Sequence, residues 1–112
     1  MNDTSRTRRA TLRDRTRTQR AAAKIRRRGV ATLATHCIAA GLRVREARTV
    51  AGSLRKNAAK ANVAGIPSVS YTHGRARTCT RYTRREVALI CLQYKPRKPA
   101  YRLAAAKLAL AA

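Results

Sequence analysis

The sequence predicts a small, mainly helical domain with a basic N-terminal arm that is disordered when free. Two observations support this fold class. Apolar residues recur at helical spacing in several stretches after Gly29, whereas Leu12 and Ile25 are the only Leu, Ile or Val residues among positions 1–28. The 112 residues suffice for one small domain. We therefore expect an arm over 1–28 and one folded domain over 29–112.

The net charge is strongly positive. Lys and Arg number 27 against 4 Asp and Glu, which gives a formal charge of +23. GC-rich codons explain part of the excess of Arg over Lys, but such codons also encode Asp and Glu, so the scarcity of acids is a property of this protein. A charge of this size opposes compaction unless a polyanion neutralises it. The expected partner is therefore nucleic acid.

The arm carries a stripe of cations at helical spacing. Like charges at this spacing destabilise an isolated helix, so we expect the arm to be disordered alone and helical only on a polyanion. In that form it resembles the arginine-rich motifs that fold into RNA grooves. A solvated basic tail and a mitochondrial transit peptide are the alternatives. On a helix, the stripe would extend over about 32 Å and consist of Arg6, Arg9, Arg13, Arg17, Arg20, Lys24 and Arg27.

Two helices are predicted after Gly29. The first covers about 30–40, because Val30, Leu33, Ala34, Cys37 and Ile38 form one apolar stripe. Gly41 then offers a left-handed stop. The second covers about 44–62 and has a basic outer side that includes Arg55 and Lys56. Its apolar face consists of Ala47, Val50, Ala51, Leu54, Ala58 and Ala61.

Residues 33–52 resemble the helix-turn-helix family. Small Cys37, Gly41 four positions later in the turn, and apolar Leu42, Ala47 and Val50 match its pattern. His36 departs from it, because that position is usually apolar. The resemblance implies that the second helix enters the major groove of DNA. An ordinary helical hairpin with a basic outer face is the alternative. The residues that would then face bases or phosphates are Arg43, Arg45, Glu46, Arg48 and Thr49.

The stretch 67–82 is predicted to be either a short β-hairpin or an ordered loop held by Tyr71 and Tyr82. Pro67 ends the preceding helix, Val69 and Tyr71 alternate with serines, and 72–74 has the composition of a turn. A hairpin here could act as a wing on DNA. Its contacts to the backbone or the minor groove would come from Arg75, Arg77 and Arg81.

Two more helices complete the prediction. Thr83 and Glu86 form a capping box and Tyr82 and Val87 a hydrophobic staple, so a helix is expected over 84–94. Residues 82–88 resemble the opening of excisionase-type and MerR-type DNA-binding domains. A last, Ala-rich helix restarts at Ala100 and is expected to pack against the others, with Tyr101, Ala104, Ala105 and Leu108 facing inward.

The sequence contains no residue pattern typical of an enzyme. Four acids and two histidines do not form a catalytic set, and Cys37, Cys79 and Cys91 lack metal-ligand spacing. We therefore expect no cofactor and no metal. No apolar run approaches the length of a membrane span. The expected location is the cytoplasm, at the nucleoid.

The expected function is DNA binding by a small regulator or accessory factor, of the kind found on phages and mobile elements. DNA is favoured over RNA because RNA-binding surfaces usually expose aromatic side chains, and the chain has 4 Tyr and no Phe or Trp. RNA binding through the arm, as in antiterminators or ribosome-associated proteins, and nonspecific packaging of a genome are the alternatives. The oligomeric state is left open, with a homodimer as one option.

Overall fold

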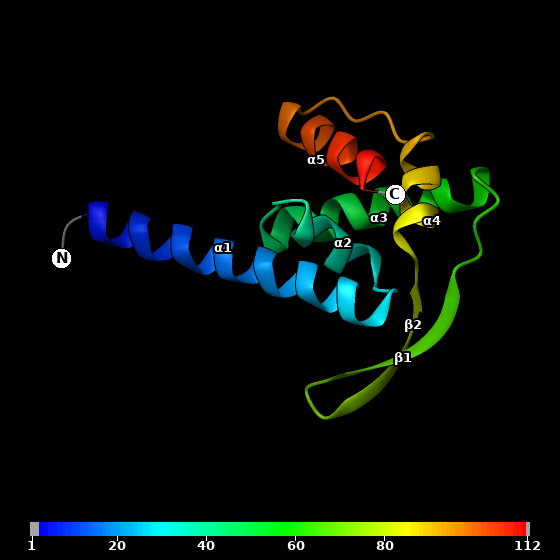
Figure 1. Cartoon of the computed structure of the whole chain (residues 1–112), viewed down its shortest axis with the longest axis horizontal. Helices are drawn as coiled ribbons and strands as arrows, with labels where there is room; N and C mark the ends of the chain where they lie inside the picture. Colours follow the sequence, from blue (N-terminus) through cyan, green and yellow to red (C-terminus); the bar gives the residue numbers. More distant parts are fainter. Residues whose placement is uncertain (1–2, 112) are drawn as a thin grey trace.

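The computed structural model describes residues 3–111, which form five helices and one antiparallel hairpin (Figure 1). This confirms the mainly helical fold class and the hairpin predicted from the sequence. In chain order the elements are α1 (Asp3–Arg28), α2 (Leu33–Ala39), α3 (Val44–Lys60), β1 (Ile66–Thr72), β2 (Arg75–Arg81), α4 (Arg84–Cys91) and α5 (Pro99–Leu110).

The core lies between α2, α3, α4 and α5. The inner face of α3 contributes Val50 and Leu54, which pack with Val87 and Ile90 of α4. The inner face predicted for α3 is confirmed, because Ala47, Val50, Ala51, Leu54 and Ala58 are all buried. Many of these side chains are only a methyl group, so the helices can approach closely and a short chain can still enclose a core.

The turn between α2 and α3 closes as the sequence predicts. Gly41 has φ +103°, its N–H donates to the Ile38 carbonyl at 3.0 Å, and the Leu42 N–H donates to the Cys37 carbonyl at 3.2 Å. These two bonds form a Schellman motif, in which a left-handed glycine lets the chain turn back. Leu42 is buried beneath the turn. The four residues 40–43 therefore join α2 to α3 in a fixed geometry.

Some predicted helix ends are wrong by a few residues. The helix expected over 30–40 begins at Leu33, because Thr32 Oγ1 accepts a hydrogen bond from the Thr35 N–H and so caps the helix there. Val30 precedes this cap and is outside the helix. The helix expected over 44–62 ends at Lys60, because Asn62 takes a left-handed φ of 55°. The helix expected over 84–94 ends at Cys91.

The prediction of a disordered N-terminal arm is wrong. Residues Asp3–Arg28 form α1, a continuous helix about 39 Å long at 1.5 Å per residue. Ala21 and Ile25 are buried against the body, and the Gly29 N–H closes the helix on the Ile25 carbonyl at 2.7 Å. A docked last turn supplies the nucleus that an isolated helix lacks, after which each further residue costs little to add.

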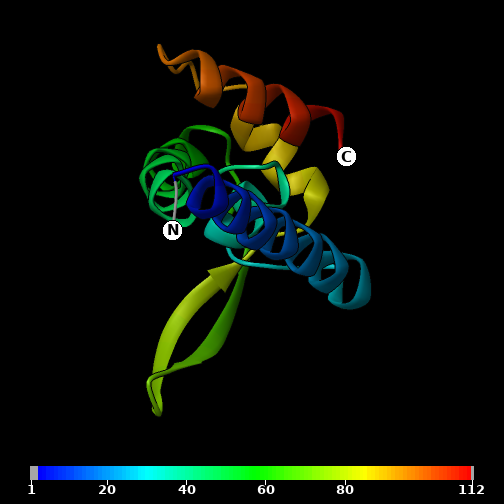
Figure 2. The ribbon, with the colours of Figure 1, turned by 90° about the vertical axis from the view of Figure 1, so that its left-hand side faces the viewer.

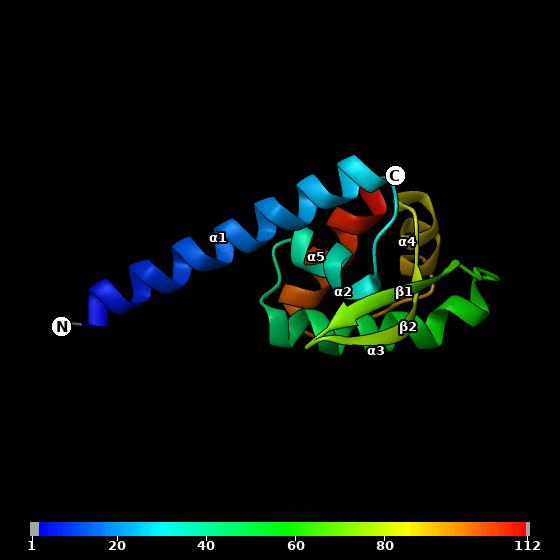
Figure 3. The ribbon, with the colours of Figure 1, turned by 90° about the horizontal axis from the view of Figure 1, so that it is seen from below.

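The N-terminal half of α1 projects from the body. No residue from 3 to 20 is buried, and Figures 1 and 3 show this part of the helix extending beyond the end of the molecule where α3 begins. The C-terminal half packs against α2. The helix is therefore anchored at one end and exposed to solvent at the other.

The hairpin also projects from the body, in another direction (Figures 1 and 2). Strands β1 and β2 pair in antiparallel register from Ile66↔Arg81 to Thr72↔Arg75. The connecting residues His73 and Gly74 both have positive φ, 52° and 74°, which is the geometry of a type I′ turn. Beyond β2, Tyr82 forms a single β-bridge to Ala31. This bridge attaches the base of the hairpin to the segment between α1 and α2.

The capping box at Thr83 begins α4 as predicted. Thr83 Oγ1 accepts from the Glu86 N–H at 3.2 Å, and Glu86 Oε1 accepts from the Thr83 N–H at 3.0 Å. Tyr82 and Val87 are both buried, in the positions of a hydrophobic staple. The last helix, α5, packs on α4 and buries Ala104 and Leu108. Within residues 3–111 no helix combines the length and the apolar composition that crossing a membrane requires.

Candidate nucleic-acid interface

The outer face of α3 carries four of the predicted contact residues, Arg45, Arg48, Arg55 and Lys56, and all four are exposed. Because the opposite face of α3 is buried in the core, helical geometry directs these side chains into solvent. Within residues 3–111, none of the four has a carboxylate within ion-pair distance. Their charge is therefore available to a partner.

Small residues separate these cations on α3. Thr49 and Gly52 fall between Arg45, Arg48 and Lys56 at helical spacing. A Cβ built on Gly52 would meet no atom within 4 Å, so the glycine is not required by packing inside the protein. The side chains at the centre of the outer face are consequently short, so the backbone of α3 can come close to a partner surface.

The polar atoms of two other predicted contact residues are used within the protein. Glu46 Oε1 accepts a hydrogen bond from the Arg43 N–H at 3.4 Å at the start of α3. The positive end of the helix dipole lies there and stabilises the negative charge of Glu46. The Thr49 hydroxyl donates to the Arg45 carbonyl at 3.2 Å. Of the contacts implied by the family resemblance, the guanidinium groups of Arg45 and Arg48 are therefore better placed to reach a partner.

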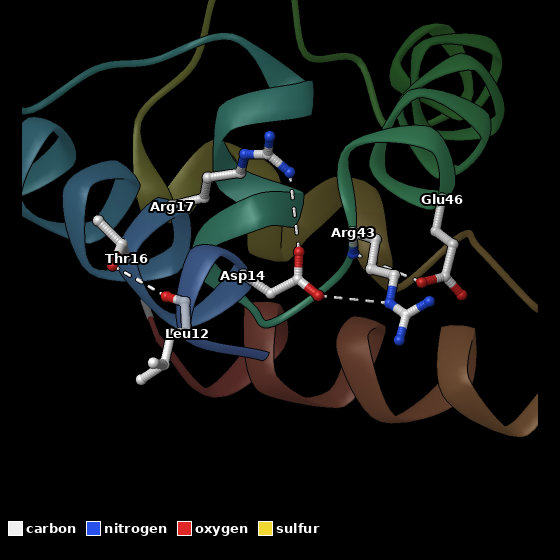
Figure 4. A network of polar contacts seen from close by, with 6 residues as sticks. All are labelled: Leu12, Asp14, Thr16, Arg17, Arg43 and Glu46. Atoms are coloured by element: carbon white, nitrogen blue, oxygen red, sulfur yellow. Dashed lines mark hydrogen bonds and ion pairs between the residues drawn. The ribbon is translucent and has the colours of Figure 1, made fainter. Parts of the chain in front are cut away.

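Asp14 links α1 to the start of α3 (Figure 4). Its Oδ2 lies 3.5 Å from Arg43 Nε, and its Oδ1 lies 3.7 Å from Arg17 Nη1. Arg43 remains 74% exposed, so its guanidinium can still meet a partner while the ion pair holds it near α1. No local pattern in the sequence predicts this link, because Asp14 and Arg43 are far apart in the chain and Asp14 has several arginines nearer to it in sequence.

The cationic stripe predicted on α1 is present on the helix surface. Arg6, Arg9, Arg13, Arg17, Arg20 and Arg27 are exposed, and Lys24 is half-buried. The buried residues Ala21 and Ile25 lie on a different side of the helix, so the stripe runs along its flank. Because α1 projects past the start of α3, its free half extends the basic surface beyond the body.

The hairpin has two chemically different faces. Since side chains alternate along a strand, Arg75, Arg77 and Arg81 share one face of β2, opposite Thr72, Ser70 and Ile66 of β1. Arg75 and Arg77 are exposed, whereas Arg81 is half-buried and its Nη2 donates to the Val69 carbonyl at 3.4 Å. Arg81 is thus tied to the hairpin itself, which leaves Arg75 and Arg77 as the cations free to act near the turn.

The other face of the hairpin is apolar and exposed. Tyr71 pairs with Ala76 and Val69 with Thr78 in the register of the two strands, and the Tyr71 side chain is 79% exposed. The alternative expectation, an ordered loop held by Tyr71 and Tyr82, is wrong, because these residues belong to a hairpin on which the Tyr71 side chain lies in solvent. The alternation of Val69 and Tyr71 with serines was the signal that could have separated the two faces.

Two of the three cation-bearing elements lie near each other, because Arg55 of α3 lines the same hollow as Thr78 and Thr80 of β2, whereas α1 lies apart from them (Figure 3). Figures 2 and 3 show the hairpin on the same side as α3, with the free half of α1 leading away from the start of α3. The structure therefore brings the predicted residues of α3 and the hairpin to one side. Most of the α1 stripe continues away from them.

His36 and two cysteines are core residues. His36 is 1% exposed, and its Nε2 donates to the Tyr82 carbonyl at 2.7 Å, which joins α2 to the start of α4. Burial lowers its pKa, and Arg84 lowers it further. Burial also raises the pKa of Cys37 to about 12 and that of Cys91 to about 11, so both are protonated thiols and poor nucleophiles at neutral pH. In the described chain, no three His, Cys, Asp or Glu residues gather to hold a metal ion.

Comparison with family models, with curated proteins and with solved structures found no match to this chain. The chain is a small helical protein with basic residues on a core helix, a projecting hairpin and a projecting helix.

Proposed function

We propose that the protein binds duplex DNA, with α3 in the major groove and the hairpin as a wing on the adjoining backbone. The observation that carries this proposal is the outer face of α3, where four exposed cations without carboxylate partners oppose a fully buried face. A helix held in this way can present its outer side to a groove about 12 Å wide. With 17 residues, α3 extends for about 25 Å.

The short helix α2 supports the position of α3. It packs against α3 and α1 and is joined to α3 by the rigid turn at Gly41, which is the arrangement a helix-turn-helix uses to brace its recognition helix. In this proposal Arg45 and Arg48, near the start of α3, reach base edges. An Arg fork can donate two hydrogen bonds to a guanine edge, so these residues would carry sequence preference.

The other basic surfaces would add affinity without sequence preference. Arg75 and Arg77 would contact the backbone beside α3, and the stripe of α1 would lie along phosphates beyond it. Contacts to phosphates position a protein on DNA and do not read the bases. Each phosphate neutralised contributes about −0.9 to the slope of log K against log salt, so binding should weaken steeply as salt rises.

RNA is the second candidate, and Tyr71 is the observation that favours it. A Tyr that is 79% exposed on a basic hairpin can stack on an unpaired base, which is a common mode of RNA recognition. The preformed helix α1 also offers an arginine-rich rod that an RNA groove could accept. Arg45 and Arg48 do not need to take part in this mode.

The experiment that decides between these functions is a competitive selection from mixed pools of random duplex DNA and structured RNA. It is carried out at about 200 mM salt, where nonspecific electrostatic binding is weak. Enrichment of a duplex site supports the proposal. Enrichment of an RNA hairpin assigns the function to α1 and Tyr71, and the absence of any enriched sequence indicates a nonspecific packaging protein.

The proposed activity is that of a small regulator or accessory factor. Such a protein would act in the cytoplasm, at the nucleoid, and a phage or another mobile element is the genetic setting we propose for it. Its charge of +23 gives it a general attraction to any nucleic acid. The sequence preference of α3 is what would direct it to particular sites.

A further inference from the structure

The ends of four helices line a cavity that opens partly to solvent and that the nucleic-acid interface does not use. Its volume is about 160 Å³. The wall consists of residues from the last turns of α1 and α2, the first turn of α4 and the end of α5. Neither α3 nor the hairpin lines it. The cavity is thus separate from the surfaces to which we assign DNA binding.

Most of the cavity wall is apolar. The apolar lining residues include Ile25 and Ala22 of α1, Ala39 of α2, Val87 of α4 and Leu108 of α5. Ile25, Val87 and Leu108 are buried by the surrounding helices, so the space between them is shaped by fixed parts of the fold. An apolar wall of this kind favours an apolar guest over water.

Two cations also line the cavity, Arg84 from the start of α4 and Lys107 from α5. None of the lining residues is acidic, and within residues 3–111 neither cation has a carboxylate within ion-pair distance. Arg84 is half-buried, whereas Lys107 is exposed. Two positive charges beside an apolar space attract a ligand that carries one negative charge.

The remaining polar lining residue is His36, which is neutral. Its Nε2–H is used by the Tyr82 carbonyl at 2.7 Å, and burial together with the nearby Arg84 keeps its pKa below the usual range. The ring therefore adds an aromatic wall and no further charge. Positive charge at the cavity comes from Arg84 and Lys107.

We propose that this cavity binds a small carboxylate with a compact apolar body, about the size of one benzene ring. The size follows from the volume, because an apolar protein cavity of about 150 Å³ accepts benzene. The charge follows from Arg84, whose planar guanidinium can bind a carboxylate through two hydrogen bonds, with Lys107 as a second cation. The apolar body of the ligand would contact Ile25, Val87 and Leu108.

Occupancy of the cavity would link α1 to the rest of the domain. A ligand in this space touches both the last turns of α1 and the end of α5, so it would tighten the anchor of the projecting helix. The proposal does not depend on DNA binding, because it concerns other residues and is tested without nucleic acid.

The test is a calorimetric titration of the full chain with benzoate at about 150 mM salt. Benzamide has the same ring without the charge, and acetate has the charge without the ring. We expect one saturable site for benzoate, with both control compounds at least tenfold weaker. Equal binding of acetate and benzoate would show a general attraction of anions to the basic surface and would overturn the proposal.

Variants locate the site. Lys107→Gln and Arg84→Gln should each weaken benzoate binding about tenfold, and Ala22→Leu, which places three more carbons in the cavity, should abolish it. Lys95→Gln removes one exposed charge outside the cavity and should have no effect. Equal losses in Lys95→Gln and Lys107→Gln would contradict the proposal.

A measurement on the unaltered protein guards against variants that fail to fold. In the NMR spectrum, the ring protons of bound benzoate should show nuclear Overhauser effects to the methyl groups of Ile25 and Leu108. Contacts only to residues outside the cavity would overturn the proposal.

Discussion

Neutralising part of the basic stripe on α1 should reduce the salt dependence of DNA binding by a calculable amount. Arg6, Arg13 and Arg20 are exposed and share the basic stripe. Replacing all three by Gln removes three positive charges and leaves the buried anchor at Ala21 and Ile25 intact. If each Arg neutralises one phosphate, the slope of log K against log salt should become less negative by about 2.7.

The same slope gives the expected change in affinity. Between 50 and 200 mM salt, a slope difference of about 2.7 corresponds to a factor of about 40. The affinity gap between the unaltered chain and the triple variant should therefore narrow about 40-fold over this range. Fluorescence anisotropy with one labelled duplex, repeated at several salt concentrations, measures both slopes.

A matched variant separates the role of α1 from the loss of net charge. Lys95→Gln, Arg97→Gln and Lys98→Gln also remove three cations, from the link between α4 and α5. This control should leave the slope within about 0.5 of the original, because it removes no proposed phosphate contact. Circular dichroism should show that both variants keep their helices. Unchanged slopes in the α1 variant, or equal changes in the two variants, would refute the assignment of α1 to phosphates.

Three further predictions concern Gly52, His36 and Leu54. Gly52→Ala should raise the free energy of unfolding, measured by urea denaturation, by about 0.5–1 kcal/mol, since Ala is the better helix former and its Cβ meets nothing within 4 Å. Gly52→Leu should keep the fold but weaken DNA binding at least tenfold. Undiminished binding by Gly52→Leu would mean that the centre of α3 does not contact the groove. Burial lowers the pKa of His36 in the folded state, so the unfolded chain binds a proton at this residue more readily than the folded chain does. The free energy of unfolding should therefore be constant above about pH 6.5 and decrease as the pH falls below that value. Urea denaturation from pH 5 to 8 should show this decrease in the control variant His73→Asn, which alters the exposed turn, and much less of it in His36→Gln. Leu54→Ala should reduce the free energy of unfolding by about 2–5 kcal/mol, because it leaves a cavity at a fully buried position, and a loss below 1 kcal/mol would show that the core is loosely packed.

Local signals in the sequence were sufficient to predict the secondary structure of most of the domain. The capping box of Thr83 and Glu86 located the start of α4, and Gly41 located the turn before α3, because each depends on residues within one helical turn. The inner face of α3 was recognisable for the same reason. In these segments the local preference and the tertiary contacts favour the same structure.

Features that depend on distant contacts could not be predicted. The sequence of α1 favours disorder when considered alone, and the packing of Ala21 and Ile25 reverses that preference. His36 occupies a position that is usually apolar, and the sequence does not show why. The structure does, because the His36 ring bonds to the Tyr82 carbonyl, 46 residues along the chain. The ion pair of Asp14 with Arg43 is of the same kind.

The candidate interface was predicted in part. Helical spacing identified the cations of α3 and of the α1 stripe, since one surface of a helix follows directly from its period. Sequence alone could not show that Arg81 bonds to the Val69 carbonyl or that Tyr71 stands in solvent. Both depend on the pairing register of the hairpin and on its projection from the body.

The central claim, that the outer face of α3 reads duplex DNA, is tested most directly by one comparison. The double variant of α3 carries Arg45→Ala and Arg48→Ala. The control double variant carries Lys95→Ala and Arg97→Ala, which remove the same amount of charge from a segment outside α3. For each variant, the affinity for a selected duplex site is divided by the affinity for a scrambled duplex at the same salt.

At about 1–3 kcal/mol for each bidentate contact to a base, the α3 variant should lose at least tenfold in this ratio, and the control variant should keep the ratio of the unaltered chain. Equal ratios in the two variants would contradict the claim and reduce α3 to an electrostatic surface.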